Sequence, residues 1–166
     1  MIGLAMTMAL ALPVQGTMQA ERCSTPAAVP AQLAGWSAMT PVTASAEAPG
    51  APSVTFGRGL RVTLSANERL RFARPPLKAG AAATSGGMIA VTVETAGRYR
   101  IALGDSAWVD VITGTTAVDS VAHDHGPACS PIRKMVDFDL VPGRYLIQLA
   151  GSKSATLPLM IVRLRR

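Results

Sequence analysis

Both histidines of this chain lie in one short segment, residues 123–129, which also contains an aspartate and a cysteine. Side chains two residues apart on an extended strand point to the same face, so His123 and His125 would be able to bind one divalent metal ion together. Asp119 or Asp137 would complete the ligand set, and imidazole ligands outside the cytoplasm favour copper or zinc. A Gly-Pro pair follows and indicates a turn, so the alternative is a solvent-facing loop.

The other residues that are able to do chemistry lack the spacing of known catalytic motifs. Ser106 lies in a Gly-Asp-Ser-Ala-Trp stretch without the second glycine of a nucleophile elbow. Asp137 and Asp139 share a strand face, as glycosidase carboxylates do, but they alternate with apolar residues, which is typical of the solvated side of a half-buried strand. Gly86 and Gly87 precede neither a lysine nor a helix that would bind phosphate. We therefore assign no catalytic residue and expect no cofactor apart from a divalent metal.

The chain contains two cysteines, Cys23 near its beginning and Cys129 far along it. Thiols of exported proteins tend to pair in an oxidising compartment, so we predict a Cys23 to Cys129 disulfide. This bond would hold an N-terminal arm against the rest of the domain. The alternative is two unrelated thiols.

Export is suggested by residues 1–20, which carry no charged side chain and include an apolar run over residues 2–13. A membrane span needs roughly 20 apolar residues, and this shorter run has the length of a signal-peptide core. We predict a signal peptide over residues 1–20, a periplasmic or secreted protein, and no transmembrane span in its mature form. The alternative is a buried N-terminal strand or helix.

The formal net charge is +6, which would suit nucleic acid if the basic residues clustered with exposed aromatic ones. Most of them instead alternate with apolar residues along expected strands, as Arg98 and Arg100 do. Together with export, this pattern argues against a nucleic-acid partner. Arg163, Arg165 and Arg166 form a basic tail, which would serve as a solubilising end or make weak contacts with anionic envelope surfaces.

The elements that must position these residues are short strands. Residues 97–103 and 143–149 repeat a Gly-Arg-Tyr start followed by alternating apolar residues, the pattern of a half-buried antiparallel strand. Tyr99 and Tyr145 occupy equivalent places in this repeat, so we expect both at core corners, each hydroxyl bound to the backbone. Further alternating runs predict a hairpin over residues 60–72 and one run from Val118 to Val121.

These runs are bounded by Gly, Asn, Asp or Pro, and no helical period lies between them. They predict an all-β fold, an antiparallel β-sandwich or jelly roll of about eight short strands over residues 53–166. Residues 21–52 are rich in Pro and Ala and predict an extended N-terminal arm, anchored by Trp36. Residues 75–87 predict a long surface loop.

Three stretches carry a resemblance to a known family: the Glu-Thr-Ala-Gly-Arg-Tyr start of residues 94–103, the Trp-Val-Asp-Val of residues 108–111, and the Leu-Val-Pro-Gly-Arg-Tyr within residues 136–145. In this order they resemble the bacterial pre-peptidase C-terminal domains, over roughly residues 54 to 164. The resemblance implies a small exported β-sandwich with an accessory role.

The chain also resembles short exported proteobacterial proteins, some of which are labelled homogentisate 1,2-dioxygenase. Members of that enzyme family are much longer and bind iron with two His and one Glu in a cupin-type barrel. None of that ligand motif has a counterpart at a position of this chain. The label would add iron to copper and zinc as a candidate metal.

Two functions follow from these observations. The first is a non-catalytic, exported binding or accessory module of the periplasm or cell envelope, whose partner would be an envelope protein, a polymer or a metal. The second is a small metal-dependent enzyme that uses His123 and His125.

Overall fold

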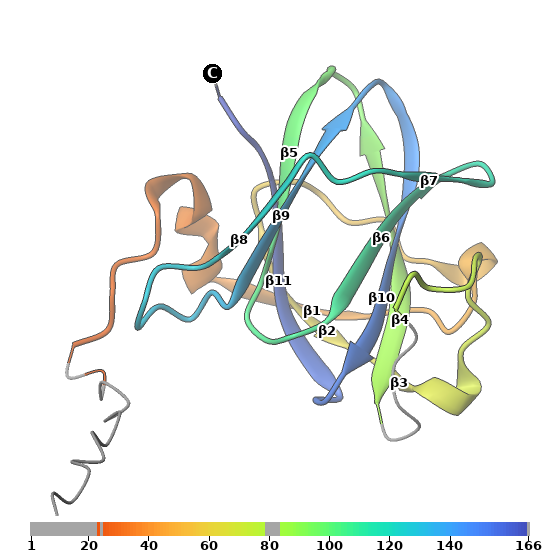
Figure 1. Cartoon of the computed structure of the whole chain (residues 1–166), viewed down its shortest axis with the longest axis horizontal. Coiled ribbons are helices and arrows are strands. Elements are labelled where there is room, and N and C mark those ends of the chain that lie inside the picture. The colour runs from red at the N-terminus through yellow and green to blue at the C-terminus, as the bar shows by residue number, and fades with distance from the viewer. Residues whose placement is uncertain (1–22, 24, 79–83, 166) are drawn as a thin grey trace, which may run out of the picture.

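The computed structural model describes residues 23, 25–78 and 84–165. In this part of the chain two β-sheets pack face to face, so the predicted all-β sandwich is confirmed (Figure 1). The predicted signal peptide over residues 1–20 lies outside the described residues. No helix in the described ranges is long and apolar enough to cross a membrane.

The first sheet has six strands in the spatial order β1 Met39–Thr43, β2 Gly59–Thr63, β11 Thr156–Arg163, β5 Gly97–Leu103, β9 Lys134–Leu140 and β8 Ala122–His125. The second has five, in the order β3 Ser65–Ala66, β4 Ser85–Val93, β10 Gly143–Ser152, β6 Trp108–Thr113 and β7 Thr116–Val118. Three short 3-10 helices accompany them, η1 Ala31–Ser37, η2 Ala48–Gly50 and η3 Asn67–Arg69. The described strands therefore outnumber the predicted eight, because several are only two to five residues long.

The main core lies between the sheets and is built from the alternating apolar residues of the long strands. Along β11, Leu157, Leu159 and Ile161 point into this core, while Met160 and Val162 belong to a second apolar cluster on the outer face of the first sheet. The same alternation places the repeat's tyrosines inside, as predicted. The alternation of apolar residues along each strand thus determines which face of the strand is buried.

Both tyrosines form the corners that the repeat predicts. The hydroxyl of Tyr99, on β5, donates a hydrogen bond to the carbonyl of Thr95 at 2.7 Å. The hydroxyl of Tyr145, on β10, donates to the carbonyl of Val141 at 2.9 Å and accepts from its backbone N–H at 3.2 Å. Each bond joins a buried ring to the turn four residues before it, which closes the turn against the core.

Two predicted elements differ in the structure. The run over residues 60–72 is not a hairpin: β2 pairs with β11 in the first sheet, and β3 pairs with β4 in the second. The run from Val118 to Val121 is likewise interrupted, because Val118 ends β7 of the second sheet and Val121 immediately precedes β8 of the first. In both places the chain crosses between the layers, and continuous alternation does not reveal which sheet a residue joins.

The segment predicted as an arm belongs partly to the sandwich. From Met39 onward it forms β1, which pairs in parallel with β2, and it makes isolated bridges from Ser45 to Met88 and from Glu47 to Arg71. Extended, proline-containing chain is able to pair at a sheet edge because only one of its sides needs hydrogen bonds. The predicted surface loop over residues 75–87 similarly ends early, since β4 begins at Ser85.

Helix η1 covers the outer face of the first sheet (Figure 1). Its buried Leu33 and Trp36 pack with Met160 and the other apolar residues of the second cluster. The predicted anchoring role of Trp36 is therefore confirmed. Gly59 makes close packing possible, because a Cβ there would lie 2.6 Å from the carbonyl oxygen of Gly35.

The predicted disulfide joins Cys23 to Cys129 across a sequence separation of 106 residues. Next to it, the backbone N–H of Ala27 donates to the carbonyl of Cys129 at 3.0 Å. These two links hold the residues that precede η1 against the connection between β8 and β9. The beginning of the described chain is thus bound to the sandwich at two points, the disulfide and the buried face of η1.

Candidate functional site

The two histidines lie on β8, which forms one edge of the first sheet. His123 pairs with Val136 and His125 with Lys134 on β9. Residues two apart on a strand share a face, so the structure keeps both imidazoles on one side, as predicted. Both are exposed, and His125 Nδ1 lies 3.4 Å from the carbonyl oxygen of Arg133. The segment faces solvent, as the alternative of an exposed loop also predicted, but both histidines lie on a paired strand, and the chain leaves that strand at the Gly-Pro pair.

Neither aspartate considered as a third ligand joins the histidines. Asp137 pairs with Ala122 and therefore belongs to the opposite face of the sheet, where Arg100 binds its carboxylate. Asp119 is exposed in the connection between β7 and β8. Among the described residues no group of three or more His, Cys, Asp or Glu side chains is placed to hold a metal ion. A metal ion at this exposed sheet edge would thus have two imidazoles as its protein ligands.

The two carboxylates of β9 have different surroundings. Arg100 binds Asp137 with two hydrogen bonds, from Nε at 2.7 Å and Nη2 at 2.8 Å, and Asp137 is only 4% exposed. These bonds raise the pKa of Arg100 above its ordinary value. Arg98 binds Asp139 in the same geometry at 2.9 and 3.0 Å, but both side chains are exposed. The expectation that both carboxylates face solvent is therefore wrong for Asp137.

The reason is the length of the edge strand. β8 pairs with residues 134–137 of β9, so Asp137 has a neighbouring strand on each side. Asp139 lies beyond the end of β8 and is flanked by β5 alone. Alternation identifies the outer face of β9 correctly, but it does not show how much of that face a neighbour covers.

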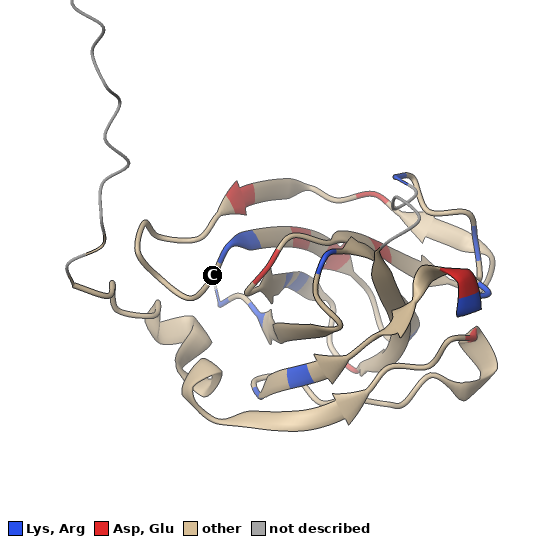
Figure 2. Ribbon diagram, turned by 90° about the horizontal axis from the view of Figure 1, so that it is seen from below, with Lys and Arg blue, Asp and Glu red and all other residues tan. Residues whose placement is uncertain are grey.

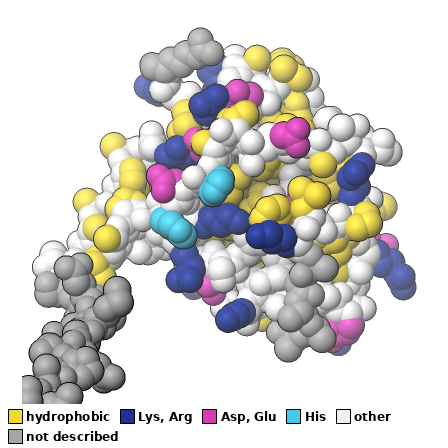
Figure 3. Space-filling model, in the orientation of Figure 1, with side chains coloured by type: hydrophobic (Ala, Val, Ile, Leu, Met, Phe, Trp, Pro, Cys, Tyr) yellow, Lys and Arg dark blue, Asp and Glu magenta, His cyan; other side chains and the backbone are white. Residues whose placement is uncertain are grey.

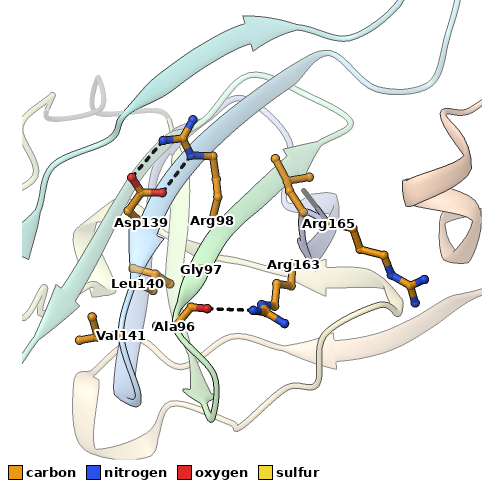
Figure 4. A pocket seen from close by; sticks show the side chains of 9 residues that line it. Ala96, Gly97, Arg98, Asp139, Leu140, Val141, Arg163 and Arg165 are labelled. Carbon is orange, nitrogen blue, oxygen red and sulfur yellow. Dashed lines mark hydrogen bonds and ion pairs between the residues drawn. The ribbon is translucent and has the colours of Figure 1, made fainter.

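One hollow of the described surface lies where β5 begins and where β9 and β11 end (Figure 4). It is open to solvent, has a volume of about 1080 Å³, and we call it the arginine hollow. Its lining residues are Ala96, Gly97, Arg98, Asp139, Leu140, Val141, Arg163, Leu164 and Arg165. Three guanidinium groups thus accompany a single carboxylate around an apolar floor.

Strand pairing brings these arginines together. Arg163 is the last residue of β11 and pairs with Tyr99 of β5, and the backbone N–H of Leu164 continues this pairing by donating to the carbonyl of Arg98 at 2.8 Å. The Arg163 side chain donates from Nη2 to the carbonyl of Ala96 at 2.9 Å. Figure 4 shows Arg165 extending away from the Arg98 and Asp139 pair. Arg163 and Arg165, both exposed, therefore border a hollow that residues of β5 and β9 also line.

A second, smaller hollow of about 510 Å³ adjoins the first and shares Arg163 with it. Its other lining residues are Ser53, Val54, Thr55, Phe56, Thr92, Glu94, Thr95 and Tyr99. The rings of Phe56 and Tyr99 lie 4.9 Å apart at its base. Because both hollows meet at Arg163, an extended ligand would be able to cross from one to the other.

The arginine hollow is suited to binding and contains no nucleophile. Its lining holds no Ser, Thr, Cys, His or Lys, and its only carboxylate is bound by Arg98. Guanidinium groups bind carboxylates and phosphates through paired N–H donors. Other basic positions are spread over strands and connections of the sandwich, as Figure 2 shows.

No protein-family model and no curated protein matches this chain. The resemblance to pre-peptidase C-terminal domains and the dioxygenase label both stay predictions. Function must therefore be argued from the geometry of the described residues. Of the residues in the arginine hollow, Arg163 and Arg165 were predicted from the sequence to serve as a solubilising end or to make weak contacts with anionic surfaces. The sequence did not predict that Arg98 and Asp139 would lie beside them, because no spacing pattern joins residues from three strands.

Proposed function

We propose that this protein is an exported, non-catalytic binding module of the periplasm or cell envelope, and that its arginine hollow binds the anionic groups of an envelope polymer. The observation that carries the proposal is the gathering of Arg98, Arg163 and Arg165 around one open, partly apolar surface. Arg98 is already paired with Asp139, so Arg163 and Arg165 supply the uncompensated charge of the lining.

Export is supported by the disulfide and by the apolar run at the beginning of the sequence. Disulfides persist in oxidising compartments and are rare in the cytosol, where thiols are kept reduced. The Cys23 to Cys129 bond holds the segment before η1 against the sandwich, which is a structural role. An envelope location would also place a protein of net charge +6 among anionic polymers.

The shape of the surface supports a polymer partner. The arginine hollow is open, and it continues into the smaller hollow at Arg163. An extended chain is able to follow such a surface and present successive anionic groups, whereas a small metabolite would be only partly enclosed. The apolar floor, which includes the 62% exposed Val141, would contact the uncharged parts of the polymer.

The test is a binding measurement with purified protein and soluble polymers. Polygalacturonate and polyphosphate present carboxylates and phosphates, and dextran is the neutral control. We expect both polyanions to bind and dextran not to bind. We also expect affinity to fall as ionic strength rises, because exposed charges are screened within about 10 Å at 0.1 M salt.

A pair of matched variants locates the site. Removing Arg163 and Arg165 together as Arg163→Gln, Arg165→Gln should weaken polyanion binding by about tenfold or more, equivalent to one strong charged contact. The control variant, Arg69→Gln, Lys153→Gln, removes the same charge from two exposed residues outside the hollow. Equal loss in both variants would show that only net charge matters and would overturn the proposal.

Metal binding is the second candidate, and one observation favours it: His123 and His125 share an exposed face of β8. Zinc or copper would be held by the two imidazoles, with water or a partner's groups completing the shell. Metal analysis of untagged protein after zinc loading, repeated on His123→Ala, His125→Ala, tests this. One metal per chain that is lost in the variant supports the candidate, and no bound metal excludes it.

A further inference from the structure

Two of the chain's three lysines lie against one indole ring. Lys78 Nζ and Lys134 Nζ are each 5.1 Å from the centroid of the Trp108 ring. The three side chains come from separate places: Trp108 begins β6 of the second sheet, Lys134 begins β9 of the first, and Lys78 follows η3 in the connection toward β4. The fold therefore places two ammonium groups against one indole ring, although the two lysines are far apart in the sequence.

The indole ring is held in a fixed orientation. Trp108 Nε1 donates to Asp110 Oδ1 at 2.7 Å, and Asp110 is buried, with 7% of its surface exposed. Gln148 Nε2 donates to the other carboxylate oxygen at 3.4 Å. A ring whose only polar atom is bound to a buried carboxylate is a rigid support for the groups on its faces.

The same glutamine anchors the segment that leads to Lys78. Gln148 is fully buried, and its Oε1 accepts from the backbone N–H groups of Ala73 at 3.0 Å and Arg74 at 3.5 Å. Its Nε2 also donates to the carbonyl of Arg74 at 3.0 Å. The Arg74 guanidinium in turn donates to the carbonyl of Thr115. Lys78 thus extends from a backbone that is fastened to the second sheet only four residues earlier.

Lys134 is half-buried, and its ammonium group keeps unused donors. Nζ donates to the carbonyl of Ala107 at 2.9 Å, which uses one of its three N–H groups. Burial lowers the pKa of Lys134, repulsion from Lys78 lowers it further, and Asp110 opposes both effects. The two positive charges therefore repel each other.

We propose that Lys78 and Lys134 form an oxyanion-binding site beside Trp108, which takes the phosphate or carboxylate group of a small ligand. An oxyanion would accept hydrogen bonds from both ammonium groups and would remove their mutual repulsion. Lysines bind such groups as point charges without demanding a fixed geometry. The hydrogen bonds of the Asp110 carboxylate go to the indole N–H and to Gln148.

The residues around the two lysines favour a ligand that carries polar and apolar groups as well as its negative charge. His125 pairs with Lys134 across β8 and β9, and directly paired residues share a sheet face. Figure 3 shows both histidines next to Lys and Arg side chains and to hydrophobic ones on the same side of the molecule. Leu77, which precedes Lys78, is 76% exposed. A ligand held by the two lysines would therefore have both polar and apolar neighbours.

Tryptophan fluorescence measures binding directly at this site. The chain has two tryptophans, and Trp36 lies on the buried face of η1, so a Trp36→Phe protein leaves Trp108 as its only indole. Titration with inorganic phosphate and, separately, with glucuronate should give a saturable change in Trp108 emission at millimolar concentration or below. Saturation by phosphate alone would identify phosphate ligands, and saturation by glucuronate alone would identify carboxylates.

The lysines supply their own matched control. Lys78→Gln and Lys134→Gln should each weaken the saturable response at least fivefold, whereas Lys153→Gln, which removes an exposed lysine from the connection between β10 and β11, should leave it unchanged. As a second measurement, NMR of the wild-type protein with isotope-labelled, methylated lysines should show shifts for the Lys78 and Lys134 signals alone. Absence of saturation with either probe, or equal weakening by Lys153→Gln, would overturn the proposal.

Discussion

Asp137 and Asp139 lie two residues apart on β9, and each binds an arginine of β5 with two hydrogen bonds. Only Asp137 is buried, because β8 covers its other side. Removing one partner of a buried ion pair leaves the other charge without compensation, whereas an exposed charge regains water. The two pairs therefore allow one interaction, an arginine–aspartate ion pair, to be compared in a buried and in an exposed position.

We expect Asp137→Ala to lower the free energy of unfolding by about 3 to 5 kcal/mol, since Arg100 would remain half-buried and unpaired. Asp139→Ala should cause a much smaller loss. Urea denaturation of both variants, followed by circular dichroism, measures the difference. Similar losses in the two variants would contradict the role that we assign to burial.

The tyrosine corners give a second prediction for single residues. Tyr99→Phe and Tyr145→Phe keep the buried ring and remove the hydroxyl, so each should cost about 1 kcal/mol of folding stability. The loss should be larger for Tyr145, whose hydroxyl both donates to and accepts from Val141, than for Tyr99, which donates to Thr95 alone. Thermal and urea unfolding of the two variants would decide, and the reverse order would contradict this reading of the corners.

At the scale of elements, the connection between β5 and β6 is linked to the one between β10 and β11 through Asp105. Its carboxylate accepts from the backbone N–H of Ser106 at 2.7 Å and from the hydroxyl of Ser154 at 2.8 Å. These bonds, with a smaller attraction from Arg133, hold the pKa of Asp105 below its ordinary value of 3.8. The ionised form therefore joins two turns at one end of the sandwich.

The hydrogen bonds of the ionised Asp105 carboxylate should make the free energy of unfolding decrease as pH falls. A carboxyl group whose pKa is lower in the folded state stabilises the fold above its unfolded pKa, and this contribution is lost as pH falls through the folded pKa. We expect Asp105→Asn to be less stable than the wild type at pH 7, and the difference to shrink as pH falls below about 4. Urea midpoints at pH 7, 4 and 2.5 test this, and a difference that stays constant with pH would contradict it.

The disulfide belongs to the same scale, because it joins the residues before η1 to the β8–β9 connection. Closing a loop of 106 residues stabilises a fold by about 4 to 5 kcal/mol in the chain-entropy account. We expect a Cys23→Ser, Cys129→Ser variant to lose up to that amount while keeping its β-sheet circular dichroism. A variant that unfolds at 25 °C would show instead that the sandwich depends on the bond.

For the whole molecule, the main core is independent of the residues before β1. Every member of the large cluster between the sheets follows residue 41, whereas Leu33 and Trp36 belong to the outer cluster. A chain that begins at Met39 should therefore still fold as a sandwich, with lower stability than the Cys23→Ser, Cys129→Ser variant because the outer face of the first sheet loses its cover. Analytical ultracentrifugation and urea unfolding would measure this, and loss of cooperative unfolding would contradict it.

Local residue order was sufficient for several features. Alternating apolar residues predicted the strands and their buried faces, because the side-chain period of two does not depend on the strand's partner. The Gly-Arg-Tyr repeat predicted two equivalent tyrosine corners, since each hydroxyl finds its acceptor only four residues earlier. The disulfide was predictable for another reason: two cysteines allow one intramolecular pairing.

Tertiary structure alone decided which strands are neighbours, and with that the surfaces that we propose to be functional. Arg98 and Arg163 line one hollow because β11 returns beside β5 after more than fifty residues, and Lys78 and Lys134 both lie against Trp108 because two sheets and a connection converge there. No period or motif records such contacts, since they arise from the order of strands in each sheet. The sequence by itself therefore determined the strands, their faces and the disulfide, and only the packing of the two layers decided where the charges gather.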